Sequence, residues 1–161
     1  MNTQFEQLNI YSLMLVFIFL VGIDQIIKFF SCSYSQEYLY CILNTGSAFG
    51  LFSQVENYAL IVGVFGIVIT GFILYFFKYL TTILPSPVLV VLLAGIVSNS
   101  IDRLFFDGVR DMFHISFIPF FGIFNVADIY LTIVCIVAAY IIFLKPIMAS
   151  NSSGTLSINK K

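Results

Sequence analysis

Four long apolar stretches constrain the fold of this chain more than any other feature of its sequence. They cover about residues 10–30, 58–79, 86–105 and 128–145 of the 161. Crossing the hydrocarbon core of a bilayer takes about 20 mostly apolar residues in a helix, so each stretch is a candidate membrane span. Only 9% of the residues are charged, against about 25% in a soluble domain. The sequence therefore predicts an all-α membrane protein built as a four-transmembrane-helix bundle.

The first apolar stretch has the position of a cleaved signal peptide, but its composition argues for a retained helix. No basic residue precedes it, and Asp24 and Lys28 interrupt it, whereas a signal peptide has a basic start and an uninterrupted apolar region. We expect residues 1–148 to form a single integral-membrane domain. Residues 149–161 (ASNSSGTLSINKK) form a polar tail, which we expect to be cytoplasmic.

Polar residues gather on one side of the membrane when the four helices run alternately up and down. These polar residues end the first and third helices, begin the fourth helix, or lie in the loops on that side. They are Asp24, Lys28, Asn44, Asn99, Asp102, Arg103, Asp111, Asn125 and Asp128. The other four lysines fall on the opposite side: Lys78, Lys145, Lys160 and Lys161. Because cytoplasmic loops are enriched in Lys and Arg, we expect both termini to be cytoplasmic and the polar cluster to face outward.

The spacing of these residues places them on shared helix faces. Asp24 and Lys28 are four residues apart and can pair along one face. A single stripe of the third helix carries Gly95, Asn99, Asp102 and Arg103. Lys28 and Arg103 are the expected counterions of the acidic groups. Any one of these residues could simply anchor a helix end in the headgroups, and Asn125 could be only a helix cap, but several polar groups meeting at one end of three helices indicate a site.

Among the hydrolytic chemistries, the residues at this end suit a pair of carboxylates. His114 is the only histidine, no Gly-x-Ser-x-Gly motif is present, and the three cysteines form no zinc-type cluster. Asp111 and Asp128 are the natural pair, since one ends a loop and the other opens the next helix. When two carboxyls share a site, repulsion keeps one protonated while the other is ionised, which suits amide hydrolysis. Cys32 and Cys41 could form a disulfide if their loop faces an oxidising compartment.

Several stretches of the sequence, in this order and spacing, resemble the bacterial lipoprotein signal peptidase family, signal peptidase II, a family of aspartyl membrane peptidases. The stretches are DQIIK (24–28), NTGSAFG (44–50), GIVSNSIDR (95–103), GVRDMFHI (108–115) and FNVAD (124–128). The resemblance runs from the first predicted helix to the last. It implies a four-helix membrane bundle with a small extracytoplasmic β-cradle and a mobile loop helix, and we expect the cradle within residues 38–51 and 114–124.

The resemblance also implies an activity and a set of site residues. The catalytic dyad would be Asp111 and Asp128. The residues expected to support it or bind substrate are Asp24, Lys28, Asn44, Gly46, Asn99, Asp102, Arg103 and Asn125. Family members remove the signal peptide from lipid-modified prolipoproteins, cutting just before the diacylglyceryl-cysteine, and need no metal or organic cofactor. The expected partners are diacylglyceryl-modified prolipoproteins and membrane lipid, with no nucleic acid and no oligomer. The expected location is the bacterial inner membrane, with the active site at its outer face.

One departure from the family pattern and two alternative functions follow from the same residues. Arg110 directly precedes Asp111, where an aliphatic residue is common, and a neighbouring cation is expected to lower the pKa of that aspartate.

A small ion-coupled transporter would also carry charges within its helices, but spread through the membrane depth. A non-catalytic relative that binds lipoproteins without cutting them is the other alternative, against which the sequence offers the presence of both aspartates.

Overall fold

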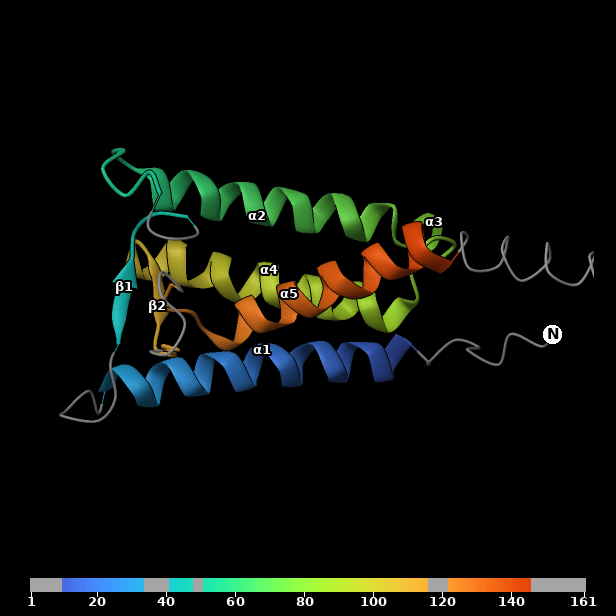
Figure 1. The fold of residues 1–161 in the computed structure, drawn as a ribbon, viewed down its shortest axis with the longest axis horizontal. Helices are drawn as coiled ribbons and strands as arrows, with labels where there is room; N and C mark the ends of the chain where they lie inside the picture. Colours follow the sequence, from blue (N-terminus) through green and yellow to red (C-terminus); the bar gives the residue numbers. More distant parts are fainter. Residues whose placement is uncertain (1–9, 34–40, 48–50, 116–121, 146–161) are drawn as a thin grey trace, which may run out of the picture.

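The computed structural model describes residues 10–33, 41–47, 51–115 and 122–145, and its helices run alternately in opposite directions (Figure 1). Four helical segments are long and apolar enough to cross a membrane. Their bounds are α1 (Ile10–Ser33), α2 (Tyr58–Tyr75), α4 (Ser86–Phe106) and α5 (Val126–Ala139), which continues as the π-helical η2 (Tyr140–Leu144). The prediction of four spanning helices is confirmed, and the protein is a multi-pass membrane protein.

The helix ends differ from the predicted ones by a few residues, for local reasons. The second span stops at Tyr75, and a short helix, α3 (Phe77–Leu80), follows it. Pro85 is the N-cap of α4, where its missing N–H costs no hydrogen bond. The fourth span begins at Val126, two residues before the predicted start, because Asn125 caps the helix there.

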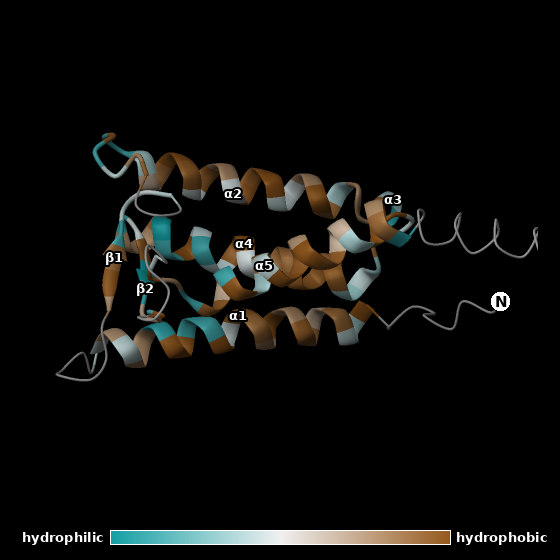
Figure 2. Ribbon diagram, viewed as in Figure 1, coloured by the Kyte–Doolittle hydropathy of each residue, from teal (hydrophilic) through white to brown (hydrophobic). Residues whose placement is uncertain are grey.

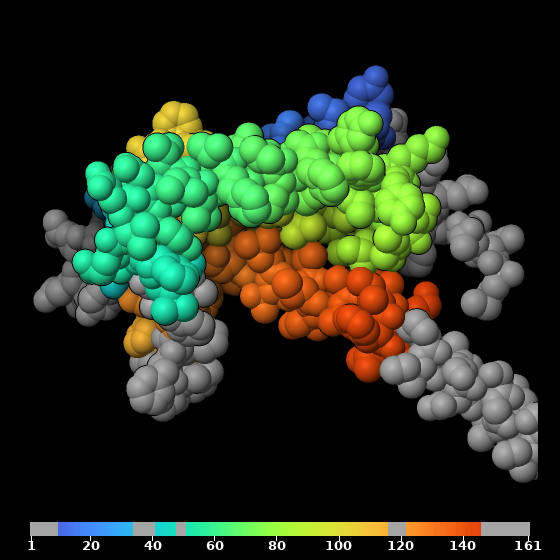
Figure 3. Space-filling model, turned by 90° about the horizontal axis from the view of Figure 1, so that it is seen from above, coloured from blue at the N-terminus to red at the C-terminus, as the bar shows by residue number. Residues whose placement is uncertain are grey.

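Helix α4 lies at the centre of the bundle and is the most buried of the four spans. It packs against α1, α2 and α5, and the view from above shows α2 lying across one face of the molecule with α5 beside it (Figure 3). Two glycines permit these close approaches. A Cβ at Gly66 of α2 would overlap Ser100 Oγ, and one at Gly95 of α4 would lie 2.8 Å from Leu131 of α5. Small residues at such contacts let membrane helices pack closely.

Hydrophilic residues of the spanning helices concentrate at the end of the bundle that carries the two strands (Figure 2). The remaining length of these helices is mainly hydrophobic, as expected where they contact lipid tails. A transporter with a charge relay would need polar groups through the membrane depth. The distribution therefore favours a site at one membrane surface.

A two-stranded antiparallel sheet covers that end. Strand β1 (Ile42–Asn44) pairs with β2 (Val109–Asp111), and a single bridge joins Phe113 to Phe124. The first strand lies in the predicted cradle region, but the second comes earlier than the predicted 114–124, of which 116–121 lie outside the described residues. The reason is local: Asp107 ends α4 with φ 57°, so the chain reverses at once into β2.

Candidate active site

Asp111 and Asp128 line the same cavity, about 320 Å³ in volume, at the strand-bearing end of the bundle. Asp111 ends β2, and Asp128 lies in the first turn of α5. The prediction that these two residues meet is therefore consistent with the fold. The other lining residues are Asn44, Ser47, Arg103, Val109, Gly122, Ile123, Phe124, Leu131 and Thr132. The cavity thus has a charged end and an apolar wall, and its volume lies at the low end of the range for ligand sites.

Each of the four carboxylate oxygens of this pair accepts one hydrogen bond from an amide N–H. Asp111 accepts from the side chains of Asn125, at 2.7 Å, and Asn44, at 3.1 Å. Asp128 accepts from the side chain of Asn99, at 2.8 Å, and from the backbone N–H of Asn125, at 3.1 Å. Asn125 therefore contacts both aspartates. One lone pair on each oxygen stays available for water or for substrate, because a carboxylate oxygen can accept two hydrogen bonds.

Asp111 is almost fully buried, with 2% of its surface exposed. The pKa of Asp111 is raised from 3.8 to about 6: burial is the largest cause and the negative charge of Asp128 adds to the rise, while the hydrogen bonds from Asn125 and Asn44 and the charge of Lys28 oppose it. Burial disfavours the charged form of a carboxyl group. Asp111 is therefore a carboxyl that can hold or release a proton close to neutral pH.

The N-terminus of α5, which presents Asp128, is fixed by a capping box and by a residue of another helix. The side chain of Asn125 accepts from the N–H of Asp128 at 3.0 Å, while the side chain of Asp128 accepts from the N–H of Asn125. Asp24 of α1 accepts from the N–H of Ala127 at 2.8 Å. The predicted cap at Asn125 is confirmed. These bonds satisfy backbone donors that a helix start leaves unpaired.

A buried ion cluster below the cavity ties α1 to α4. Lys28 lies 2.7 Å from Asp24 and 3.3 Å from Asp102, and none of the three side chains is exposed. Lys28 also donates to the side chain of Asn99 at 3.0 Å, which leaves the amide of Asn99 to donate to Asp128. The predicted pairing of Asp24 with Lys28 is confirmed. The cluster therefore orients one of the four amides that hold the aspartates.

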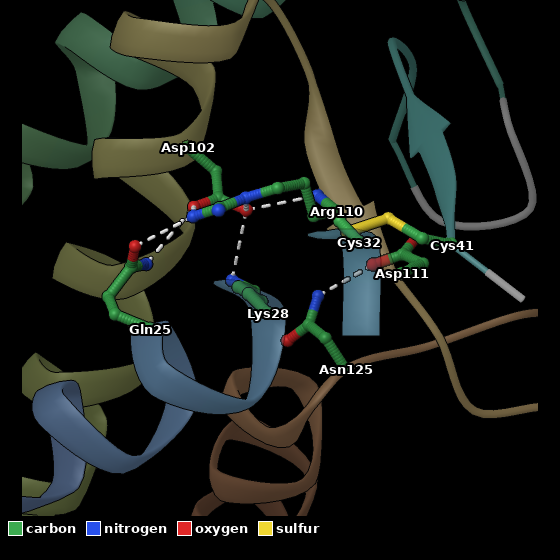
Figure 4. Close-up of a disulfide and its surroundings, with 8 residues drawn as sticks. All are labelled: Gln25, Lys28, Cys32, Cys41, Asp102, Arg110, Asp111 and Asn125. Carbon is green, nitrogen blue, oxygen red and sulfur yellow. Dashed lines mark hydrogen bonds and ion pairs between the residues drawn. A yellow bond between two sulfur atoms is a disulfide. The ribbon is translucent and has the colours of Figure 1, made fainter. Parts of the chain in front are cut away.

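Arg110 does not act on Asp111 as the sequence suggested, and the expectation that it lowers the pKa of Asp111 is wrong. Successive residues of a strand point to opposite faces, so Arg110 turns away from Asp111. Its guanidinium forms two hydrogen bonds to Asp102, at 2.8 and 3.2 Å, and one to Gln25 at 2.8 Å (Figure 4). It also lies over the ring of Phe106, 4.0 Å from the ring centroid. Arg110 is thus a counterion of the buried cluster.

The remaining predicted residues also lie at this end. Gly46 is buried, and its N–H donates to the side chain of Asn44 at 3.1 Å. Arg103 lines the cavity and donates to the backbone oxygen of Asn99 at 3.3 Å. Asp111 and Asp128 line the same cavity. The prediction of Arg103 as a counterion therefore fits the charge of the cavity rather than that of the buried cluster.

Gln25 and Ser98 belong to the cluster but were not predicted. The side-chain amide of Gln25 donates to the hydroxyl of Ser98 at 2.9 Å and to Asp102 at 3.0 Å, and Ser98 donates to Asp24 at 2.5 Å. Neither residue is charged, so neither stands out in an apolar helix. Their only sequence cue is position, since Gln25 follows Asp24 and Ser98 lies one turn before Asp102 on α4.

The described part of the chain, residues 10–33, 41–47, 51–115 and 122–145, contains no group of three or more His, Cys, Asp or Glu side chains arranged to hold a metal ion. The chemistry that the described site residues themselves can supply is acid–base chemistry by the two aspartates, supported by amides and an arginine.

Comparisons with known proteins identify the family. The signal peptidase (SPase) II profile matches residues 16–144. A lipoprotein signal peptidase of Streptococcus pyogenes serotype M5 is 33% identical over 135 residues, which cover 72% of this chain and 82% of that protein. One from Bartonella bacilliformis is 34% identical over 97 residues, which cover 59% of each chain.

The fold agrees with a solved structure as well. A structure described as a bacterial membrane enzyme solved by the in meso method superposes with a TM-score of 0.69 at 25% sequence identity, covering 84% of this chain and 89% of that one. The profile match includes all or most of each of the four membrane helices described above. The chain belongs to the signal peptidase II family.

Proposed function

We propose that this protein is an aspartic endopeptidase whose Asp111 and Asp128 activate a water molecule to cut a lipid-modified prolipoprotein just before its diacylglyceryl-cysteine. As a member of the signal peptidase II family, the protein removes signal peptides from prolipoproteins. One observation carries the aspartic mechanism: the two carboxyls line one cavity and share Asn125 as a hydrogen-bond donor.

The protonation states of Asp111 and Asp128 decide which of them acts as the acid and which as the base. Asp111, whose pKa is about 6, holds a proton in part of the molecules near neutral pH and donates it to the carbonyl oxygen of the scissile amide. Asp128 takes a proton from the attacking water, whose oxygen bonds to the carbonyl carbon. The C–N bond then breaks as Asp128 returns its proton to the leaving nitrogen and Asp111 recovers one from the tetrahedral intermediate.

The amides and the arginine of the cavity hold this arrangement without taking part in proton transfer. Asn44, Asn99 and Asn125 keep the carboxylate oxygens in place through the contacts already described. Arg103 supplies positive charge on the same cavity wall. Groups fixed before the reaction need no reorganisation when charge develops in the transition state.

The apolar wall of the cavity suits a substrate that is held in the bilayer. Val109, Ile123, Phe124 and Leu131 line the cavity together with the charged groups. A diacylglyceryl group anchored in lipid brings the scissile bond to a fixed depth, and a dyad at the end of the spanning helices meets it there.

The orientation we propose puts the site on the outer face of the bacterial inner membrane, with both termini in the cytoplasm. The short helix α3, which contains Lys78, lies at the opposite end from the strands (Figure 1), as the positive-inside rule expects. A disulfide between Cys32 and Cys41 lies at the strand-bearing end, and disulfides persist in oxidising compartments outside the cytoplasm. In this proposal residues 1–148 form one membrane domain, and residues 149–161, outside the described part, form a cytoplasmic tail.

Cleavage by single-residue variants tests the proposal. Purified enzyme in detergent is given a diacylglyceryl-modified prolipoprotein, and the product N-terminus is read by mass spectrometry. We expect Asp111→Asn and Asp128→Asn each to lose at least about 10³-fold in kcat, the scale on which catalytic groups act, with substrate still bound. Asp107→Asn, the same change at an exposed aspartate in the neighbouring turn, should stay within about 2-fold of wild type. Normal processing by a correctly folded Asp111→Asn or Asp128→Asn protein would refute the mechanism, and binding without cleavage by wild type would favour the non-catalytic alternative.

A further inference from the structure

The disulfide between Cys32 and Cys41 joins the end of α1 to the start of β1 (Figure 4). Cys32 lies in the last turn of α1, and Cys41 directly precedes Ile42, which pairs with Asp111 in the sheet. Both cysteines are partly buried, and their Cα atoms are 5.0 Å apart. The bond therefore lies one residue from the position opposite the proposed acid.

Strand β1 has few other attachments. It is three residues long, and its main contacts are with β2. Ile42 and Leu43 are 45% and 46% exposed, so side-chain burial holds the strand weakly. An isolated pair of short strands is marginally stable in water. The disulfide is thus a covalent cross-link that holds β1 in place close to Asp111.

The strand has a specific task at the proposed dyad. Ile42 and Asn44 point to one face of the sheet, the face of Asp111, because side chains alternate along a strand. From this face the amide of Asn44 donates to Asp111 at 3.1 Å and to the backbone oxygen of Ser47 at 3.3 Å. A small shift of β1 away from β2 would break the bond to Asp111.

We propose that the Cys32–Cys41 disulfide is a positioning element for catalysis: by fixing β1 to the end of α1, it holds the Asn44 amide on Asp111. The inference rests on the proposed function. The buried ion cluster fixes the end of α1 to which the disulfide is attached. Lys28 lies one helical turn before Cys32 and contacts both Asp24 and Asp102. The disulfide thus transmits the fixed position of α1 to a strand that packing alone leaves exposed.

The proposal predicts a change in the pH profile. The groups that act on Asp111 are the donors Asn125 and Asn44 and the charges of Asp128 and Lys28, with Arg103 on the same cavity wall. The hydrogen bond from Asn44 lowers the pKa of Asp111. A shift of β1 that breaks this bond while Asp111 stays buried removes this contribution alone. The pKa of Asp111 should then rise, and the pH limb that reports it should move to higher pH.

The experiment compares the folded wild-type enzyme before and after reduction with a phosphine. The phosphine gives two electrons to the S–S bond and becomes its oxide with the oxygen of one water molecule, while the two sulfurs leave as thiols. Cys32→Ser/Cys41→Ser is measured alongside, with Cys135→Ser as the matched control, because Cys135 is free and exposed on α5. Thiol labelling and thermal unfolding are recorded for each sample.

We expect loss of the disulfide to lower kcat by about 3- to 10-fold, the size of one weakened hydrogen bond, with KM little changed. The pH limb should move upward by several tenths of a unit or more, and Cys135→Ser should behave as wild type. In an Asn44→Ala background, removing the disulfide should have no further effect on kcat or the limb, because coupled residues are not additive. If Asn44→Ala is too slow for a full profile, single-turnover rates with enzyme in excess give the same comparison.

Three results would overturn the proposal. One is an unchanged kcat and pH limb after complete reduction, and another is labelling of Cys32 and Cys41 without any reductant. The third is an equal loss of activity in the wild-type and Asn44→Ala backgrounds, which would mean that the disulfide only stabilises the fold. The cleavage assay on Asp111→Asn and Asp128→Asn is separate, so failure of the proposed mechanism is distinguished from failure of this inference.

Discussion

The replacement of Asp111 by Asn should make the protein more stable at neutral pH while abolishing cleavage. The pKa of this carboxyl is raised from 3.8 to about 6 in the folded protein. Between these two pH values the folded protein binds the proton more tightly than the unfolded chain. Stability therefore falls as pH rises through this window, and the loss is complete above it.

The magnitude follows from the same two values. At 1.36 kcal/mol per pH unit, ionised Asp111 costs the folded state about 3 kcal/mol. Asn removes the charge but offers one acceptor oxygen to the two amide donors, Asn125 and Asn44, so about 1 kcal/mol of hydrogen bonding is lost. The expected net gain is about 2 kcal/mol at pH 7.5, or roughly 4–8 °C in Tm. At pH 4 the gain should vanish or reverse.

Thermal unfolding followed by circular dichroism in one detergent, from pH 4 to 8, measures this difference. Asp107→Asn is the control, since it removes the same charge from an exposed residue and should change Tm little at any pH. A Tm for Asp111→Asn at pH 7.5 that equals or falls below that of Asp107→Asn would refute the reasoning, as would a difference from wild type that does not depend on pH.

Two further substitutions probe the packing beneath the site. Lys28→Met leaves buried carboxylates without their cation and should destabilise the protein by about 3–5 kcal/mol in thermal unfolding. The control, Lys78→Met, is at an exposed lysine and should change Tm by no more than about one or two degrees. Similar Tm values for both variants would contradict a structural role for the buried cluster. Gly95→Ala places a Cβ 3.1 Å from the backbone oxygen of Ala127, so it should cost about 1–3 kcal/mol by overpacking and lower kcat by displacing the start of α5. Gly71→Ala, with nothing within 4 Å of its Cβ, should change neither quantity, and equal effects of the two alanines would rule out the close approach as the cause.

The spanning helices and the site end of the bundle could be predicted from the sequence because the bilayer restricts the choices. A segment of membrane length must be helical to satisfy its backbone, and short loops make successive helices antiparallel. The alternation alone brings Asp24, Asn99 and Asp128 to one end. The capping role of Asn125 also follows from local sequence, because a cap depends on only a few neighbouring residues.

The features that could not be predicted depend on pairing between distant segments. The direction of Arg110 is set by the pairing of β2 with β1, which lies more than 60 residues earlier, and a three-residue strand has too short a pattern to reveal its faces. The contacts of Gln25 follow from the packing of α1 on α4, and an uncharged side chain gives no sign of it. The sequence raised the Cys32–Cys41 bond, which the structure contains, only as a possibility, because its formation depends on residue 41 returning to the end of α1.

The ion pair within α1 has a consequence for how the protein enters the membrane. Asp24 and Lys28 neutralise each other 2.7 Å apart on a single helix, before any other segment is needed. A lone charge costs about 2.5–3.5 kcal/mol at the middle of a spanning helix during insertion, and less nearer the helix end, where Asp24 and Lys28 lie. The first helix can therefore insert into the membrane with no net charge on this pair. When the third spanning helix inserts later, Lys28 is already in the membrane and can pair with Asp102.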